Sequence, residues 1–147
     1  MNTVLRLHLL FVLLLTALPS RAQPMLTWDK TIGGSSWDEL NGLLTLPDGI
    51  IAAGSSRSGP GDLSWNFLIV KLDFDGNVLW QRRYGGDQDD RLWEIIPTSD
   101  GGFLAGGYSY SGVSGDRTQP SRGDMDVWIL KLDKQGQLLW ERAYGGL

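Results

Sequence analysis

The chain has 147 residues, with 13 Lys and Arg against 17 Asp and Glu, a formal charge of −4 and no cysteine. A mildly acidic surface of mixed sign argues against binding to the backbone of nucleic acids, which requires a basic stripe. Without cysteine no disulfide can hold the fold, so strand pairing and a core rich in tryptophan must stabilise it.

Residues 1–22 have the pattern of a secretory signal peptide. A basic region precedes the apolar run 9–15, and the small residues Ser20 and Ala22 mark a cleavage site after Ala22. The alternative is a membrane anchor, but the run is well short of the roughly 20 apolar residues that span a bilayer. We therefore expect an exported protein, secreted or at the cell surface, whose mature chain 23–147 has no membrane span.

One sequence module recurs along the mature chain. Its marker is a tryptophan followed by a basic residue, an Ile or Tyr and a Gly-Gly pair, and it begins at Trp28, Trp80 and Trp140. Ten of sixteen positions are identical between 71–86 and 131–146. Such self-similarity predicts a repeat architecture. The expected units are repeat 1 at about 26–77, repeat 2 at about 78–137 and the start of a third at about 138–147.

Each unit is expected to form four short strands separated by turns. In the first unit the strands cover about 26–32, 40–46, 50–55 and 67–72, with Pro-Asp-Gly and Asp-x-Asp-Gly turns between them. The first 29 positions of the two units align without a gap, which places all eight extra residues of the second unit in the loop 111–124. No segment of the mature chain shows helical periodicity.

Four strands repeated at about 50 residues favour the blades of a β-propeller over a β-solenoid, whose rungs are shorter. The predicted fold is all-β, with two four-stranded antiparallel propeller-type blades and one extra N-terminal strand, an incomplete β-propeller. Two blades cannot close a ring, because their sheet edges and apolar faces stay unpaired. Two explanations remain open: the chain is the N-terminal part of a longer protein, which we favour, or identical chains supply the missing blades.

The three tryptophan strands present one recurring face. Side chains alternate along a strand, so each tryptophan shares a face with the basic residue two positions on, and this recurring face is expected to be the packed one. The basic residues are Lys30, Arg82 and Arg142. A buried cation needs a partner, and the recurring acids Asp38 and Asp90 are candidates for a structural ion pair. Alternatively, the basic side chain lies over the tryptophan and its charged end reaches water.

The module resembles the propeller-type repeats of large secreted and cell-surface proteins of bacteria, notably of the Bacteroidetes. The residues that carry the resemblance are Trp80, Arg82, Tyr84, Gly85, Gly86, Asp90, Asp100, Gly101, Ala105, Gly106, Gly107, Lys131, Leu132, Asp133, Gly136 and Trp140. It covers essentially the whole mature chain and implies an architecture, since such repeats mostly lack an assigned biochemical role. Those proteins are usually much longer.

A second, looser similarity links Asp73-x-x-Gly76-x-x-x-Trp80 to the tryptophan-docking motif of quinoprotein-type propellers. In that motif the Asp and Gly are one residue further apart, and an Ala stands where this chain has Lys71. The similarity implies that the tryptophan docks neighbouring blades and does not imply a bound quinone.

No catalytic constellation is found in the sequence. The only histidine lies in the signal peptide and there is no cysteine, so nucleophilic catalysis lacks its usual base and thiol. The oxygen-rich segment 73–77 could hold calcium, but its counterpart 133–137 lacks most of those oxygens, and a hairpin turn explains both. We expect no enzyme activity, no cofactor and no metal site.

Binding is the more plausible role. Five aromatic residues lie outside the repeated tryptophan position and are candidates for stacking on a sugar ring or a peptide: Trp37, Trp65, Trp93, Tyr108 and Tyr110. Alternatively, they close the ends of the blades. We expect a secreted, non-catalytic repeat protein with a structural or protein-interaction role. A glycan-binding propeller assembled from two-blade chains is the alternative.

Overall fold

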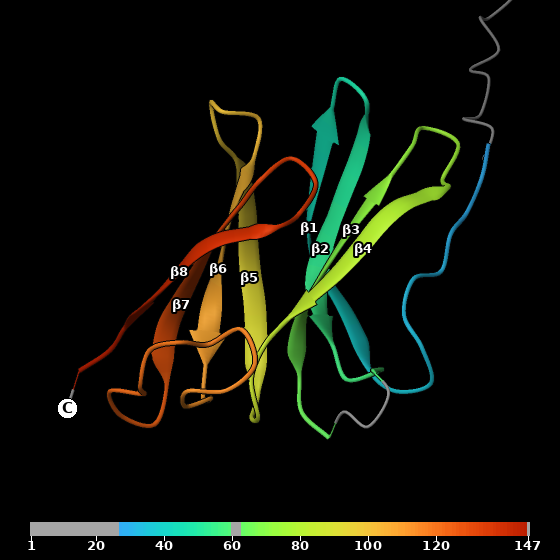
Figure 1. Ribbon diagram of the computed structural model, residues 1–147. Helices are drawn as coiled ribbons and strands as arrows, with labels where there is room; N and C mark the ends of the chain where they lie inside the picture. Colours follow the sequence, from blue (N-terminus) through green and yellow to red (C-terminus); the bar gives the residue numbers. More distant parts are fainter. Residues whose placement is uncertain (1–26, 60–62, 147) are drawn as a thin grey trace, which may run out of the picture.

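The computed structural model describes residues 27–59 and 63–146 (Figure 1). The expected signal peptide lies outside these residues. The described part is all-β, as predicted, and contains no helix that could cross a membrane. The first sheet consists of β1 (Asp38–Leu46), β2 (Gly49–Ser56), β3 (Asn66–Leu72) and β4 (Val78–Tyr84). The second consists of β5 (Asp90–Pro97), β6 (Phe103–Ser109), β7 (Asp126–Leu132) and β8 (Leu138–Tyr144).

Both sheets are antiparallel meanders in which each strand pairs with the next one along the chain. This simple order follows from the short turns, since Gly49, Gly76 and Gly136 have the positive φ that such turns require. Each sheet takes the last three strands of one predicted repeat and the tryptophan strand that opens the next. Trp80 therefore belongs to the outer strand of the first sheet and Trp140 to that of the second.

The predicted extra N-terminal strand is wrong in the part of the chain that the structure describes. Residues 27–34 form no strand, although they carry the same motif as β4 and β8. A strand needs a partner for its backbone groups, and β4 already pairs with the edge of β3, at Lys71 with Trp80, for example. Trp28 is held instead by its indole, whose Nε1 donates to the carbonyl of Phe74 at 2.9 Å.

The ungapped alignment of the two units also needs correction. Leu40 pairs with Gly54 in the first sheet, and Leu92 pairs with Gly107 in the second. Equivalent residues are therefore 52 apart in β1 and β5 but 53 apart in β2 and β6. One extra residue lies in the β5–β6 turn and the other seven in the β6–β7 loop. The sequence alignment hid the extra residue because the second turn has two consecutive glycines. Asp48-Gly49 therefore matches Asp100-Gly101, although Gly102 is the structural equivalent of Gly49.

The main core lies between the two sheets, which stand side by side in Figure 1. Phe67 and Ile69 from the first sheet are fully buried against Leu92, Trp128 and Leu130 from the second. The rings of Phe67 and Trp128 have centroids 5.1 Å apart. Burial of large apolar side chains contributes about 1.5–3 kcal/mol each, so this contact is the principal source of stability. A smaller cluster on the opposite face of the first sheet consists of Leu68, Val70 and Leu72, with Ile32 and Ile50 against it.

The prediction that the recurring tryptophan face is packed holds for β4 only. Tyr84 is buried and Trp80 and Arg82 are half-buried against the second sheet. On β8 the same face is exposed, and the residues buried there are Glu141 and Ala143 of the opposite face. The difference arises because the second sheet covers β4, whereas no described residue covers the corresponding side of β8.

Candidate functional site

The contact between the two sheets, called the junction below, is made by one row of paired residues on the first sheet. Glu39, Ser55, Phe67 and Tyr84 are direct cross-strand neighbours and so share a face; we call them the docking row. Glu39 forms a 3.2 Å ion pair with Arg91, and Ser55 Oγ accepts from the amide of Leu92 at 2.9 Å. Phe67 packs on Trp128, and the Tyr84 hydroxyl donates to the carbonyl of Gly136.

The second sheet has an equivalent row that the first sheet does not cover. Arg91, Tyr108, Val127 and Tyr144 are cross-strand neighbours in the same order; we call them the free row. Tyr144 is 56% exposed, whereas its equivalent Tyr84 is 4% exposed. Val127 is likewise 50% exposed, whereas Phe67 is completely buried. Val127 and Tyr144 of the free row are therefore uncovered in the described structure, whereas Arg91 contacts Glu39 and Trp65 and Tyr108 packs on Trp93 and Tyr110.

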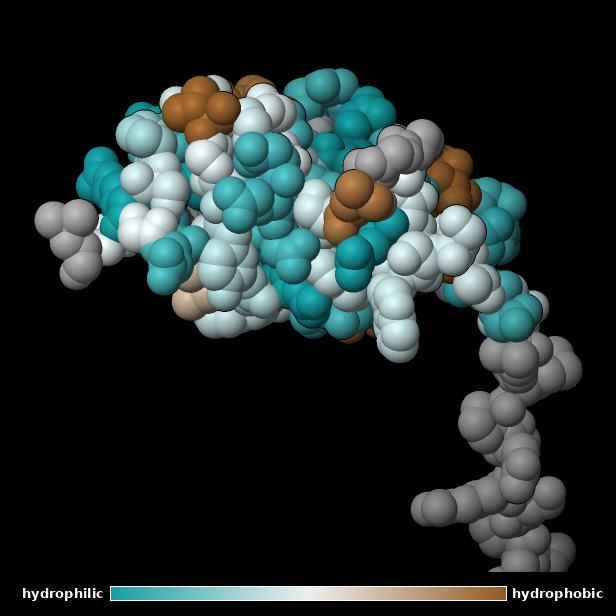
Figure 2. All heavy atoms as spheres, turned by 90° about the horizontal axis from the view of Figure 1, so that it is seen from below, coloured by the Kyte–Doolittle hydropathy of each residue, from teal (hydrophilic) through white to brown (hydrophobic). Residues whose placement is uncertain are grey.

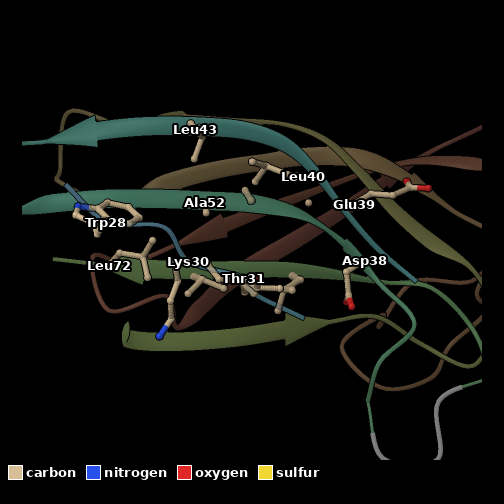
Figure 3. A pocket seen from close by; sticks show the side chains of 14 residues that line it. Trp28, Lys30, Thr31, Asp38, Glu39, Leu40, Leu43, Ala52 and Leu72 are labelled. Atoms are coloured by element: carbon tan, nitrogen blue, oxygen red, sulfur yellow. The ribbon is translucent and has the colours of Figure 1, made fainter. Parts of the chain in front are cut away.

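The first sheet has a groove on the face that points away from the second sheet (Figure 3). Its volume is about 480 Å³, and Trp28 lies at one end and Asp38 at the other. Leu40 and Leu43 of β1 point into it and are each 62% exposed. Their equivalents in the second sheet, Leu92 and Ile95, are 0% and 3% exposed because the first sheet covers them. The groove is thus the receiving half of the junction, left open.

The five aromatic candidates fall in three places. Trp93 and Tyr110 pack on Tyr108 of the free row and form a cluster with it, with ring centroids 5.3 Å and 5.8 Å from that of Tyr108. Trp37 stands alone before β1 and is largely exposed. Trp65 is buried at the junction, where the guanidinium of Arg91 lies 4.0 Å from its ring centroid. The structure therefore brings three of the five together and gives Trp65 a partner inside the fold.

The predicted ion pair between the recurring acid and the recurring base is wrong. In the described part of the chain no salt bridge within 4.0 Å involves Arg82, and its guanidinium donates to the carbonyl of Gln81. Asp38 and Asp90 instead accept from the amides of Gly34 and Gly86, at 2.9 Å and 2.7 Å. Each acid therefore closes the Gly-Gly turn that precedes its strand. A capped turn needs no cation, so the basic side chain can lie along the sheet and reach solvent.

The two equivalent acids differ in their titration. Burial raises the pKa of Asp90 above its ordinary value, against hydrogen bonds from Ser109, Gly86 and Ser111 that lower it. Burial also acts to raise the pKa of Asp38, but hydrogen bonds from Ser56, Gly34 and Ser58 outweigh it and the pKa is lowered. The reason is position: Asp90 is completely buried beside the junction and the β6–β7 loop, whereas Asp38 borders the open groove.

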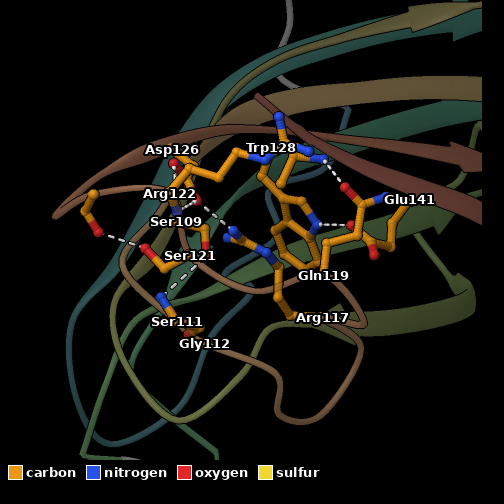
Figure 4. A network of polar contacts seen from close by, with 12 residues as sticks. Ser109, Ser111, Gly112, Arg117, Gln119, Ser121, Arg122, Asp126, Trp128 and Glu141 are labelled. Atoms are coloured by element: carbon orange, nitrogen blue, oxygen red, sulfur yellow. Dashed lines mark hydrogen bonds and ion pairs between the residues drawn. The ribbon is translucent and has the colours of Figure 1, made fainter. Parts of the chain in front are cut away.

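A buried polar network ties the longer β6–β7 loop to the second sheet (Figure 4). Arg117 is completely buried and pairs with Asp126 at 2.5 Å. Glu141 accepts from Thr118 and from the indole Nε1 of Trp128, at 2.6 Å and 2.8 Å. These hydrogen bonds hold the pKa of Glu141 below its usual value, although burial opposes them. Arg117 and Asp126 neutralise each other's charge inside the fold, which indicates a structural role, and Nε and Nη1 of Arg117 have no hydrogen-bond partner among the described residues.

Sequence reasoning missed a repeated lysine–aspartate pair. Lys71 lies 2.6 Å from Asp48, and Lys131 lies 2.8 Å from Asp100 across the equivalent turn. The hydrogen bond from Lys131 holds the pKa of Asp100 well below its usual range. Both partners recur in both units, and that recurrence was the available signal. The buried Arg117, by contrast, belongs to the longer loop of the second unit and has no counterpart that repetition could reveal.

Metal binding finds no support in the described residues. No group of three or more His, Cys, Asp or Glu side chains is placed there to hold an ion. The Asp73 carboxylate accepts from the amides of Asp75 and Asn77 at 2.9 Å and 2.8 Å, and Asp133 makes the same bonds in its own turn. The acids considered for calcium are thus engaged in hairpin turns.

Seen from below, the apolar side chains on the surface form separate patches among hydrophilic ones (Figure 2).

No family model matches this sequence, and no curated protein is detectably similar to it. The candidate site therefore has to be defined by the chain itself. It consists of two unpaired halves of one contact: the free row on the second sheet and the groove on the first. Because the junction is the filled version of that contact, it supplies the template for what each half can bind.

Proposed function

We propose that this chain is an exported, non-catalytic β-repeat protein whose four-stranded sheets stack as propeller-type blades, and that its role is structural or in protein interaction. One observation carries the proposal: the free row occupies the same strand positions as the docking row, and its residues Val127 and Tyr144 are exposed. A surface that already mediates one sheet-to-sheet contact, and that recurs exposed, is suited to bind a further sheet of the same kind.

The absence of cysteine allows a direct test with a single thiol. A chain is made in which residues 87–146 are repeated once after Gly146, and Val127→Cys is introduced in the first copy of that segment. At a concentration where both chains are monomeric, we expect the thiol at position 127 to react readily with a maleimide in the ordinary chain and slowly in the extended one, because the added sheet covers it.

Leu139→Cys is the matched control. Leu139 is 57% exposed on the opposite side of β8, and its equivalent Leu79 stays 53% exposed although Trp80 is packed. The thiol at position 139 should therefore react equally in both chains. Equal reactivity at position 127 in the two chains would show that an added sheet does not stack on the free row, and the proposal would fail.

Glycan binding is a second candidate, supported by the cluster of Trp93, Tyr108 and Tyr110. Trp93 is 62% exposed, and aromatic faces of this kind stack on sugar rings. An oligosaccharide that binds here should lose affinity with Trp93→Ser and not with Trp37→Ser, because Trp37 stands apart from the cluster. Loss of affinity in both variants, or in neither, would contradict this assignment.

A further inference from the structure

We infer that a second copy of this chain binds head to tail, with the free row of one copy seated in the groove of the next. The inference rests on the proposed function and names its partner. The two exposed surfaces are opposite halves of the junction, so one molecule carries both the surface and its receptor. A second copy is therefore a partner whose fit can be examined residue by residue.

Each position of the docking row has an equivalent in the free row, which predicts the positions that meet in the inferred contact. Glu39, Ser55, Phe67 and Tyr84 meet Arg91, the Leu92 amide, Trp128 and the Gly136 carbonyl in the junction. By equivalence, Arg91, Tyr108, Val127 and Tyr144 of one copy would meet Glu39, the Leu40 amide, Leu68 and the Gly76 carbonyl of the next. Glu39, Leu40 and Leu68 all line the groove.

The charges remain complementary when the two sheets exchange roles. In the junction the docking row presents Glu39 and the receiving sheet presents Arg91. In the inferred contact the free row presents Arg91 and the receiving sheet presents Glu39. Arg91 and Glu39 already pair with each other within each molecule, so a second copy would extend the alternation of base and acid along the contact. Two like residues at this position would have repelled each other and excluded a second copy.

Side-chain volumes in the inferred contact differ from those in the junction, and the differences offset one another. The docking row has a small residue beside an aromatic one, Ser55 next to Phe67, and it receives the large Trp128. The free row has the aromatic and the smaller residue exchanged, Tyr108 next to Val127. The groove has Leu68 where the second sheet has Trp128, and by equivalence Leu68 meets Val127, so the volume lost there offsets the volume gained at the neighbouring Tyr108.

Trp28 occupies the position that the incoming Trp140 would need. A side chain at Gly136 would meet the ring of Trp80, and one at Gly76 would meet the ring of Trp28. The N-terminal segment thus supplies the tryptophan of the missing sheet without supplying its strands. Because residues 27–34 are not paired in a sheet, they can be displaced more easily than β4 or β8, and the contact competes with them.

The two halves differ from each other, so the contact is heterologous and a pair of molecules keeps one free half at each end. This property allows a mixing experiment. Leu43→Glu disables the groove and Tyr144→Ser disables the free row, and both side chains are exposed, so the fold should be retained. Leu40→Glu and Val127→Asp serve as second variants of each half, and circular dichroism confirms the β-structure of all four.

The mature chain, residues 23–147, is examined by analytical ultracentrifugation over a range of concentrations. We expect the unaltered chain to associate, and each variant alone to lose about 30-fold or more in association constant, the effect of removing a central anchor of an interface. A mixture of Leu43→Glu with Tyr144→Ser should form a one-to-one dimer, because each contributes the half that the other lacks. Trp28→Ser should strengthen the association.

Other results would overturn the inference. An unaltered chain that stays monomeric excludes a second copy as the partner, while reduced thiol reactivity at position 127 in the extended chain would still uphold the proposed stacking of repeats. Self-association of the Leu43→Glu and Leu40→Glu variants would show that the groove is not used. A mixture that stays monomeric would rule out the head-to-tail arrangement, and weaker association of Trp28→Ser would rule out displacement of the N-terminal segment.

Discussion

The two sheets have the same four-stranded plan but different surroundings. Leu92 and Ile95 of the second sheet are covered by the first sheet, whereas their equivalents Leu40 and Leu43 border an open groove. On the other side, Tyr84 of the first sheet is covered and Tyr144 of the second is exposed. Equivalent residues therefore differ in burial because of their neighbours, which shows that a repeat sequence specifies a contact surface and leaves its occupancy to the next sheet.

The largest contrast is expected between the two long loops. Arg117→Ala removes one partner of a completely buried ion pair and leaves Asp126 charged in the core, which should lower the free energy of unfolding by about 3–5 kcal/mol. Arg57→Ala in the shorter β2–β3 loop removes one hydrogen bond to the Leu63 carbonyl at the surface and should cost about 0.5 kcal/mol. Urea unfolding of both variants measures the difference, and equal losses would contradict it.

The docking row and the free row should respond differently to loss of a hydroxyl. Tyr84→Phe leaves the buried carbonyl of Gly136 without its donor and should cost about 1–3 kcal/mol. Tyr144→Phe, at the exposed equivalent position, should change the free energy of unfolding by less than about 0.5 kcal/mol. Urea unfolding at a concentration where the chain is monomeric is the measurement. A large effect of Tyr144→Phe there would mean that Tyr144 is already engaged within one molecule.

The smallest effect separates the two turn-closing acids by pH. Burial raises the folded pKa of Asp90, so its contribution to stability is present at low pH and is lost as the pH rises through the window above 3.8. The folded pKa of Asp38 is lowered, burial being outweighed by hydrogen bonds, so its contribution is present above 3.8 and is lost as the pH falls below it.

Asp90→Asn and Asp38→Asn should therefore change the pH profile in opposite directions. Relative to the unaltered chain, Asp90→Asn should gain stability as the pH rises, and Asp38→Asn should lose it. The free energy of unfolding is measured by urea titration between pH 3 and pH 7, with each variant compared with the unaltered chain at the same pH. If the difference in free energy of unfolding from the unaltered chain changed with pH in the same direction for both variants, the groove and the junction would not distinguish the two acids.

The sequence by itself determined the local plan. Recurrence of Trp80 and Trp140, together with the Asp-Gly turns, was sufficient to predict the all-β fold and both four-stranded sheets. Alternation along a strand also identified correctly which side chains of β4 share a face. These features depend on turns and side-chain periodicity that act over a few residues, and they are the same in every copy of the repeat.

Only the tertiary structure decided which of those faces is filled. The segment around Trp28 has the motif of a strand and forms none, because β4 already occupies the edge of β3. The acids Asp38 and Asp90 close turns instead of pairing with Arg82. Arg117 is buried against Asp126 because the β6–β7 loop folds back onto the second sheet, which no repeated motif predicts. Burial depends on residues far away in the chain, so identical motifs end up in a core, in a groove or on a free surface.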